Sequence, residues 1–237
     1  MSLTEVSTYD VVKKQFMLKF KAFSKVFTAL IIAQIIAMLF SAGSSSSSGG
    51  SFGSGHQLFQ FYYVTGDIVF TFTLIWAVAI PYGLVKREQR TIDFTFVSNR
   101  ITNHLSNFVF LTVMSLVGAL MAFGSSLLLR TLQYLFHTNV YVQSSLTFVE
   151  VLTIISVMFL YILLLAIIGY TMALLMNLHA VMKVVVPVTV LGFAIFTAVS
   201  PIYFLESSLF LLFVKVLFTV LALLGAILMF SDRWEVR

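Results

Sequence analysis

The segment FVEVLTIISVMFLYILLLAIIGYTMALL, residues 148–175, contains a single charged residue, Glu150. A helix needs about 20 predominantly apolar residues to cross the hydrocarbon core of a bilayer, and this run exceeds that length. The whole chain shares its character, because 60% of the 237 residues are hydrophobic and 10% are charged. Soluble domains have roughly 45–50% apolar and about 25% charged residues. The sequence therefore predicts an integral membrane protein.

Further apolar runs surround this segment and predict an all-α membrane protein with six transmembrane helices. An amphipathic helix over residues 9–21 precedes the first span. The Ser/Gly tract from Ser41 to His56 cannot bury apolar surface, so we expect a mobile outer loop there. The chain then forms one transmembrane domain, 1–237, with spans at about 26–42, 60–84, 108–129, 148–175, 184–204 and 209–230.

The basic residues predict the orientation of these spans. With both termini inside, twelve Lys and Arg residues lie on the cytoplasmic side, and Arg130 and Lys215 alone lie on the outer side. This asymmetry follows the positive-inside rule and accounts for the formal charge of +5. The sequence therefore gives no reason to expect a nucleic-acid partner.

The helix predicted over 9–21 has an apolar stripe and a basic face. At 100° per residue the stripe contains Val12, Phe16, Phe20 and Phe23, with Lys14, Lys21 and Lys25 opposite. Lys13 and Lys19 flank the stripe, where long stems can snorkel. We expect this helix to lie in the cytoplasmic interface and bind anionic headgroups, mainly through Lys14, Phe16, Phe20 and Lys21.

Motifs for catalysis are absent from the sequence. It has no phosphate-binding G-x-x-x-x-G-K-[ST], no H-E-x-x-H and no G-x-S-x-G. No cysteine is present, and the four histidines fall on different loops. The sequence thus predicts a chain that is not an enzyme and that holds no metal or cofactor.

Four ionisable residues lie near the predicted outer boundary. An ionised group within lipid is costly, so each is expected to face protein or water. Two roles are possible for these residues. Lys215 could form a structural ion pair with one of the acids, or the residues could line a translocation path. The four residues are Asp67, Glu150, Glu206 and Lys215.

Small residues recur at helical spacing on the third predicted span, which would let a neighbouring helix approach closely. Packing within the bundle and dimerisation both fit this pattern, which contains Ser115, Gly118, Ala119 and Ala122.

The polar segment 86–107 must lie in the cytoplasm, yet it contains Phe94, Phe96 and Val97. Apolar side chains outside the bilayer favour a docking element over an ordinary solvated loop.

The order of elements resembles the permease subunit of a type-2 ABC exporter. The resemblance rests on the basic amphipathic helix DVVKKQFMLKFKAF, on the polar segment entering a span through FVSNRITNHLSNFVFL, and on the break between Pro201 and Ser208. It implies that 9–21 is the elbow helix, that roughly 87–99 is the coupling helix seated in a separate ATPase, and that roughly 201–208 forms re-entrant helices. The implied ATPase contacts are Arg87, Glu88, Arg90, Thr91, Phe94, Phe96, Val97, Ser98 and Arg100.

This resemblance implies a bacterial plasma-membrane permease that pairs with a second copy or a related permease and with two copies of an ABC ATPase. ATP and Mg would be bound by that ATPase and not by this chain. Within the family, the size is similar to Gram-positive exporters of antimicrobial or amphipathic peptides, the phenol-soluble modulin exporters among them. The expected function is export of an apolar or amphipathic cargo such as a cytolytic peptide or a drug. A stand-alone integral membrane enzyme or immunity-type protein is the alternative, and it would need a constellation of polar groups buried at one depth, which the sequence does not reveal.

Overall fold

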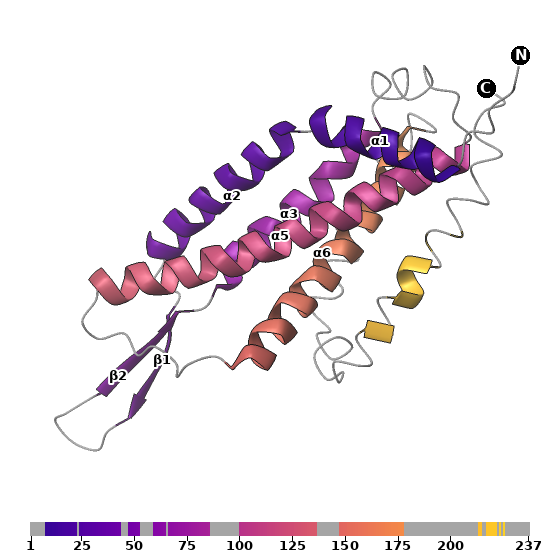
Figure 1. Cartoon of the computed structure of the whole chain (residues 1–237). Helices are drawn as coiled ribbons and strands as arrows, with labels where there is room; N and C mark the ends of the chain where they lie inside the picture. Colours follow the sequence, from indigo (N-terminus) through magenta and orange to yellow (C-terminus); the bar gives the residue numbers. More distant parts are fainter. Residues whose placement is uncertain are drawn as a thin grey trace, which may run out of the picture.

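A computed structural model describes residues 8–22, 24–43, 47–52, 59–64, 66–85, 100–136 and 147–177, together with 213–214, 217–221, 223 and 225. The named elements in these ranges are helices and one two-stranded sheet (Figure 1). They are α1 (Thr8–Ala22), α2 (Ser24–Gly43), β1 (Ser47–Phe52), β2 (Phe59–Val64), α3 (Asp67–Leu84), α5 (Arg100–Phe136) and α6 (Phe148–Met176).

Four of the described helices are long and apolar enough to cross a membrane, which indicates a multi-pass membrane protein. They contain the candidate spans Ser24–Ser41, Asp67–Leu84, Thr102–Leu132 and Phe148–Met176. These helices correspond to the first four predicted spans. The predicted spans 184–204 and 209–230 lie wholly or largely outside the described residues.

Helix α3 packs against α2, α5 and α6, and α5 also packs against α6. Contacts along these helices show their directions: Gly66 meets Ser126 and Thr73 meets Gly118, so α3 and α5 are antiparallel. Gly169 meets Val78, and Tyr82 donates a hydrogen bond to Met172 Sδ, so α3 and α6 run parallel. Figure 1 shows the sheet at one end of the bundle and α1 at the other.

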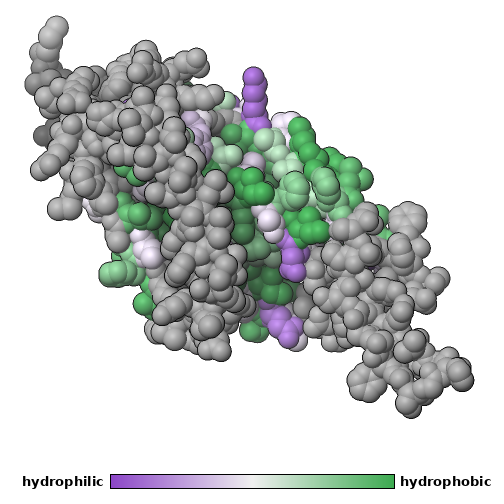
Figure 2. All heavy atoms as spheres, turned by 180° about the vertical axis from the view of Figure 1, so that it is seen from behind, coloured by the Kyte–Doolittle hydropathy of each residue, from purple (hydrophilic) through white to green (hydrophobic). Residues whose placement is uncertain are grey.

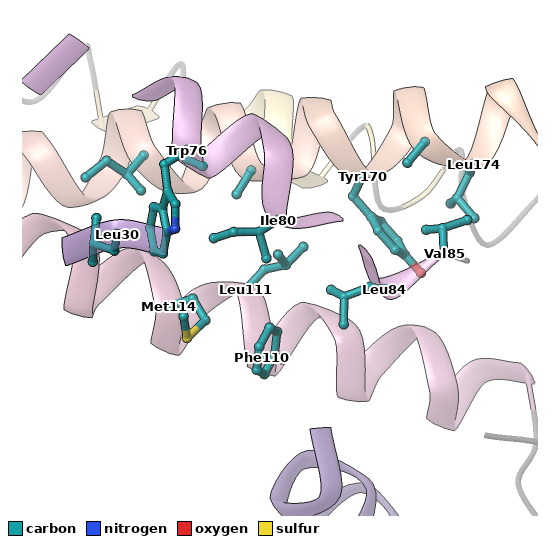
Figure 3. Close-up of a cluster of buried hydrophobic side chains, with 14 of the residues drawn as sticks. Leu30, Trp76, Ile80, Leu84, Val85, Phe110, Leu111, Met114, Tyr170 and Leu174 are labelled. Carbon is teal, nitrogen blue, oxygen red and sulfur yellow. The ribbon is translucent and has the colours of Figure 1, made fainter. Parts of the chain in front are cut away.

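The core is apolar and lies where α2, α3, α5 and α6 meet (Figure 3). Trp76 is one of its buried members, and its indole Nε1 donates to the carbonyl of Val26 at 3.1 Å. Large apolar side chains also cover much of the outer surface, which is mostly green where it is described in Figure 2. On α2 alone the exposed ones include Ile31, Ile32, Ile35, Ile36, Leu39 and Phe40. A bundle that is apolar inside and outside suits lipid as its solvent.

The small residues of the third predicted span are used for packing inside the bundle. Ser115, Gly118, Ala119 and Ala122 are all buried. A Cβ built on Gly118 would lie 3.0 Å from Trp76 Cζ3. Of the two uses left open by the sequence, packing within the bundle is therefore the one observed.

The second predicted span is wrong at its start, because α3 begins at Asp67 and not near residue 60. The preceding FQFYYV is strand β2, which pairs antiparallel with β1 in the register Ser47↔Val64 to Phe52↔Phe59. Its aromatic and β-branched residues favour a strand. Part of the Ser/Gly tract, expected to be a loop, is therefore β1. The bundle also carries this hairpin, which the all-α prediction omitted.

Helix α5 is longer than the span predicted at 108–129. It contains 37 residues, from Arg100 to Phe136, and so includes the last turns of the segment expected to be a separate polar element. The polar residues Asn103, His104 and Asn107 belong to the same continuous helix as the apolar span.

Candidate functional site: a polar cluster where α1 meets the bundle

Lys19 of α1 is the most unexpected buried residue of the described chain, with 1% of its surface exposed. Its Nζ donates to Asn107 Oδ1 at 2.6 Å and to Asn103 Oδ1 at 2.8 Å, both on α5. Burying an ammonium costs several kcal/mol unless hydrogen bonds replace its hydration. The two asparagines supply such bonds, and they do so because residues four apart lie one above the other on a helix face.

The same asparagine connects α1 to α6. An ammonium can only donate, so Asn107 Oδ1 faces Lys19 and its amide Nδ2 is left to face α6. That Nδ2 donates to Tyr170 Oη at 2.9 Å, and Tyr170 Oη lies 2.8 Å from His104 Nδ1. The polar cluster, which we define as Lys19, Asn103, His104, Asn107 and Tyr170, thus joins three helices. Figure 3 shows the Tyr170 hydroxyl directed from α6 toward the neighbouring helices.

Two further buried polar side chains, close to cluster residues in the sequence, have no hydrogen-bond partner among the described residues. Gln15 lies one turn before Lys19 on the same face of α1 and is 2% exposed, and neither of its amide atoms is bonded. Ser106, between the two asparagines of α5, is fully buried, and its Oγ is unbonded. An unpaired buried polar group costs about 1–3 kcal/mol. The contact between α1 and the bundle therefore combines apolar packing of Phe16 with polar side chains, of which Gln15 has no hydrogen-bond partner among the described residues.

A second polar contact lies midway along the candidate spans. Gln34 Nε2 on α2 donates to Thr73 Oγ1 on α3 at 2.7 Å, and Thr73 Oγ1 donates to the Val69 carbonyl at 2.8 Å. Gln34 Oε1 is buried and has no hydrogen-bond partner in the part of the chain that the structure describes. Such bonds hold membrane helices together, with typical strengths of about 0.6–2 kcal/mol.

The helix predicted over 9–21 is present as α1, but its buried face differs from the predicted stripe, and its place in the membrane interface stays a prediction. Lys14 and Lys21 are exposed as expected. Phe16 is half-buried, with its ring centroid 6.5 Å from that of Phe110, whereas Phe20 is 40% exposed. The prediction for Lys19 is wrong: its ammonium does not snorkel to the interface, because the oxygens of Asn103 and Asn107 lie within its reach.

Of the residues predicted to contact an ATPase, the structure describes one. Arg100 is the first residue of α5, while Arg87, Glu88, Arg90, Thr91, Phe94, Phe96, Val97 and Ser98 lie outside the described residues. Their contacts with an ATPase stay predictions.

Two of the outer ionisable residues have a described position. Asp67 begins α3 and is exposed, one turn further out than predicted, because the residues before it form β2. Glu150 caps α6, since its Oε2 accepts from the Thr147 backbone N–H at 2.9 Å. Glu206 and Lys215 lie outside the described residues. The ion pair and the translocation path both stay predictions.

Sequence reasoning missed the polar cluster. It treated His104 as one of four scattered histidines and looked for partners among residue types that form catalytic or metal sites. The missed signal is the pattern Asn103, His104, Asn107, three polar residues on adjoining faces at the entrance to a span. Among the described residues no group of three His, Cys, Asp or Glu side chains is placed to hold a metal.

Comparison with known proteins does not assign this chain to a family. No protein-family model, curated protein or solved structure matches this chain.

Proposed function

We propose that this chain is the permease subunit of an ATP-driven exporter. The observation that carries the proposal is the position of the polar cluster. Asn103 and Asn107 lie in the first turns of α5, directly after the candidate coupling segment 87–99, and they hydrogen-bond to α1 and α6. A displacement of that segment would therefore act on three helices together.

The proposed mechanism has an ATPase moving segment 87–99 when it binds ATP. Helix α5 is continuous from Arg100 into the span, so motion at its start is carried into the membrane. The hydrogen bonds of Lys19 and Tyr170 to α5 transmit this motion to α1 and α6. The bundle then rocks between inward-open and outward-open arrangements, as alternating access requires.

The partners in this proposal are two ATPase copies, which bind ATP and Mg, and a second permease copy or a related permease. The location is a bacterial plasma membrane, with the basic end of the bundle inside. The chain contains 25 Phe and 9 Tyr residues, and aromatic linings suit an apolar or amphipathic cargo better than a sugar or an ion.

The experiment is co-purification with a candidate ABC ATPase, followed by ATP hydrolysis in liposomes. Phe94→Asp places a charge at the centre of the proposed docking patch, so it should leave insertion unchanged and weaken ATPase binding or its coupling to cargo. Phe148→Asp is the matched control, because Phe148 is 81% exposed at the start of α6, at the opposite end of the bundle. A Phe94→Asp protein with wild-type association and coupled activity would contradict the proposal.

The second candidate is a stand-alone membrane enzyme or immunity-type protein. The polar cluster favours this second candidate in one respect. A stand-alone membrane enzyme needs a constellation of polar groups buried at one depth, and the cluster supplies one. The same experiment separates the two candidates: a stand-alone protein would not retain an ATPase, and Phe94→Asp would have no effect on its function.

A further inference from the structure

Helix α1 presents a basic face on the side opposite the bundle. Lys13, Lys14 and Lys21 are exposed and surround Met17, which is 54% exposed. At 100° per residue these four positions fall within about one third of the helix circumference. Leu18 and Phe20, also exposed, flank them on either side. We call this set of six residues the outer face of α1.

The inner contacts fix the direction of this face. Lys19 is hydrogen-bonded to Asn103 and Asn107, and Phe16 packs on Phe110, so α1 cannot rotate without breaking those contacts. One residue separates α1 from α2, which begins a candidate span at Ser24. The outer face is therefore held at the boundary of the bilayer, with cationic heads and apolar side chains on the same surface.

We propose that anionic phospholipid headgroups bind the outer face and clamp α1 onto the bundle. Lysines near an anionic membrane surface each strengthen binding by roughly fivefold, and apolar neighbours insert beside the headgroups. The inner contact leaves the Gln15 amide buried without a hydrogen-bond partner among the described residues, and this cost offsets part of the stabilisation from the Lys19 hydrogen bonds and the Phe16–Phe110 packing. A ligand that binds the docked helix shifts the docking equilibrium in its favour.

This proposal links lipid composition to the polar cluster. Because Lys19 belongs to the same helix as the outer face, headgroup binding on one side stabilises the hydrogen bonds to α5 on the other. Coupling of this kind is reciprocal, so breaking the inner contacts should weaken lipid binding by the same factor. The inference does not depend on an ATPase, and it can fail or hold independently of the proposed transport function.

The test is hydrogen exchange of the α1 amides in the full chain, reconstituted in nanodiscs of phosphatidylcholine alone or with about one third phosphatidylglycerol. Three lysines at roughly fivefold each predict up to about 100-fold slower exchange of α1 with the anionic lipid. The triple variant Lys13→Gln/Lys14→Gln/Lys21→Gln should lose this slowing, and about 1 M salt should abolish it in the unaltered chain by screening.

The matched control is Arg130→Gln, which removes a positive charge near the opposite end of the bundle and should keep the lipid effect. Equal α1 exchange in the two lipids, or a triple variant that keeps the slowing, would overturn the proposal. Equal exchange would instead fit an acidic protein as the occupant of this face.

Discussion

Replacing Asn107 with Leu tests the polar cluster most directly, because this residue bonds to two other helices. The substitution removes an acceptor of the buried Lys19 ammonium and a donor to Tyr170 Oη. A hydrogen bond to a charged group is worth about 1.5–3 kcal/mol and a neutral one about 0.5–1.5 kcal/mol. We therefore expect Asn107→Leu to lower the free energy of unfolding by about 2–4 kcal/mol.

The second half of this prediction is a rescue. In Asn107→Leu the costly species is a buried ammonium with fewer acceptors, so removing that charge should restore stability. The double variant Lys19→Met/Asn107→Leu should regain at least about 1 kcal/mol over the sum of the single effects, measured by equilibrium unfolding in mixed micelles. Lys25→Met is the control, since Lys25 is exposed and lies outside the outer face of α1, so its loss should change stability by less than about 0.5 kcal/mol.

Additivity of the two substitutions within about 0.5 kcal/mol would refute the reasoning. It would mean that Lys19 and Asn107 stabilise the protein independently. The hydrogen bond at 2.6 Å would then not be the contact that compensates burial of the ammonium.

Two further predictions concern packing and topology. A Cβ at Gly169 would lie 2.7 Å from the Val78 carbonyl oxygen, so Gly169→Ala should separate α3 from α6 and cost about 1–3 kcal/mol in unfolding titrations. Gly124→Ala should be neutral or stabilising, because among the described residues a Cβ there would meet nothing within 4 Å beyond its chain neighbours and its own helix backbone. Equal effects of the two substitutions would contradict the close approach of α3 and α6. Single cysteines at Ser47 and Ser98, in a chain without natural cysteine, should react oppositely with an impermeant thiol reagent added outside, and equal labelling would overturn the predicted orientation.

Local patterns predicted the long helices well. The apolar run 148–175 coincides with α6 to within one residue, because Thr147 and Glu150 form a capping box at its start. Helix α1 was also predicted, since its basic and apolar residues recur at helical spacing.

Prediction failed where structure depends on residues distant in the sequence. The apolar residues of FQFYYV predict the start of a span. The segment is a strand because it pairs with residues 47–52, which local sequence does not reveal. The local sequence predicts that Lys19 is an interfacial lysine. It is a buried donor only because α5 packs against α1 and brings Asn103, 84 positions along the chain, within hydrogen-bond distance. The same holds for His104, whose neighbour Tyr170 lies 66 positions away.

The length of α5 has a mechanical consequence. Its 37 residues extend roughly 55 Å at about 1.5 Å per residue, whereas the hydrocarbon core of a bilayer is about 30 Å thick. This continuous helix is closely packed near its middle, where a Cβ on Gly118 would lie 3.0 Å from Trp76. A sideways push on the end that bears Asn103 would swing the far end, near Phe136, in the opposite direction without any change in the helix itself.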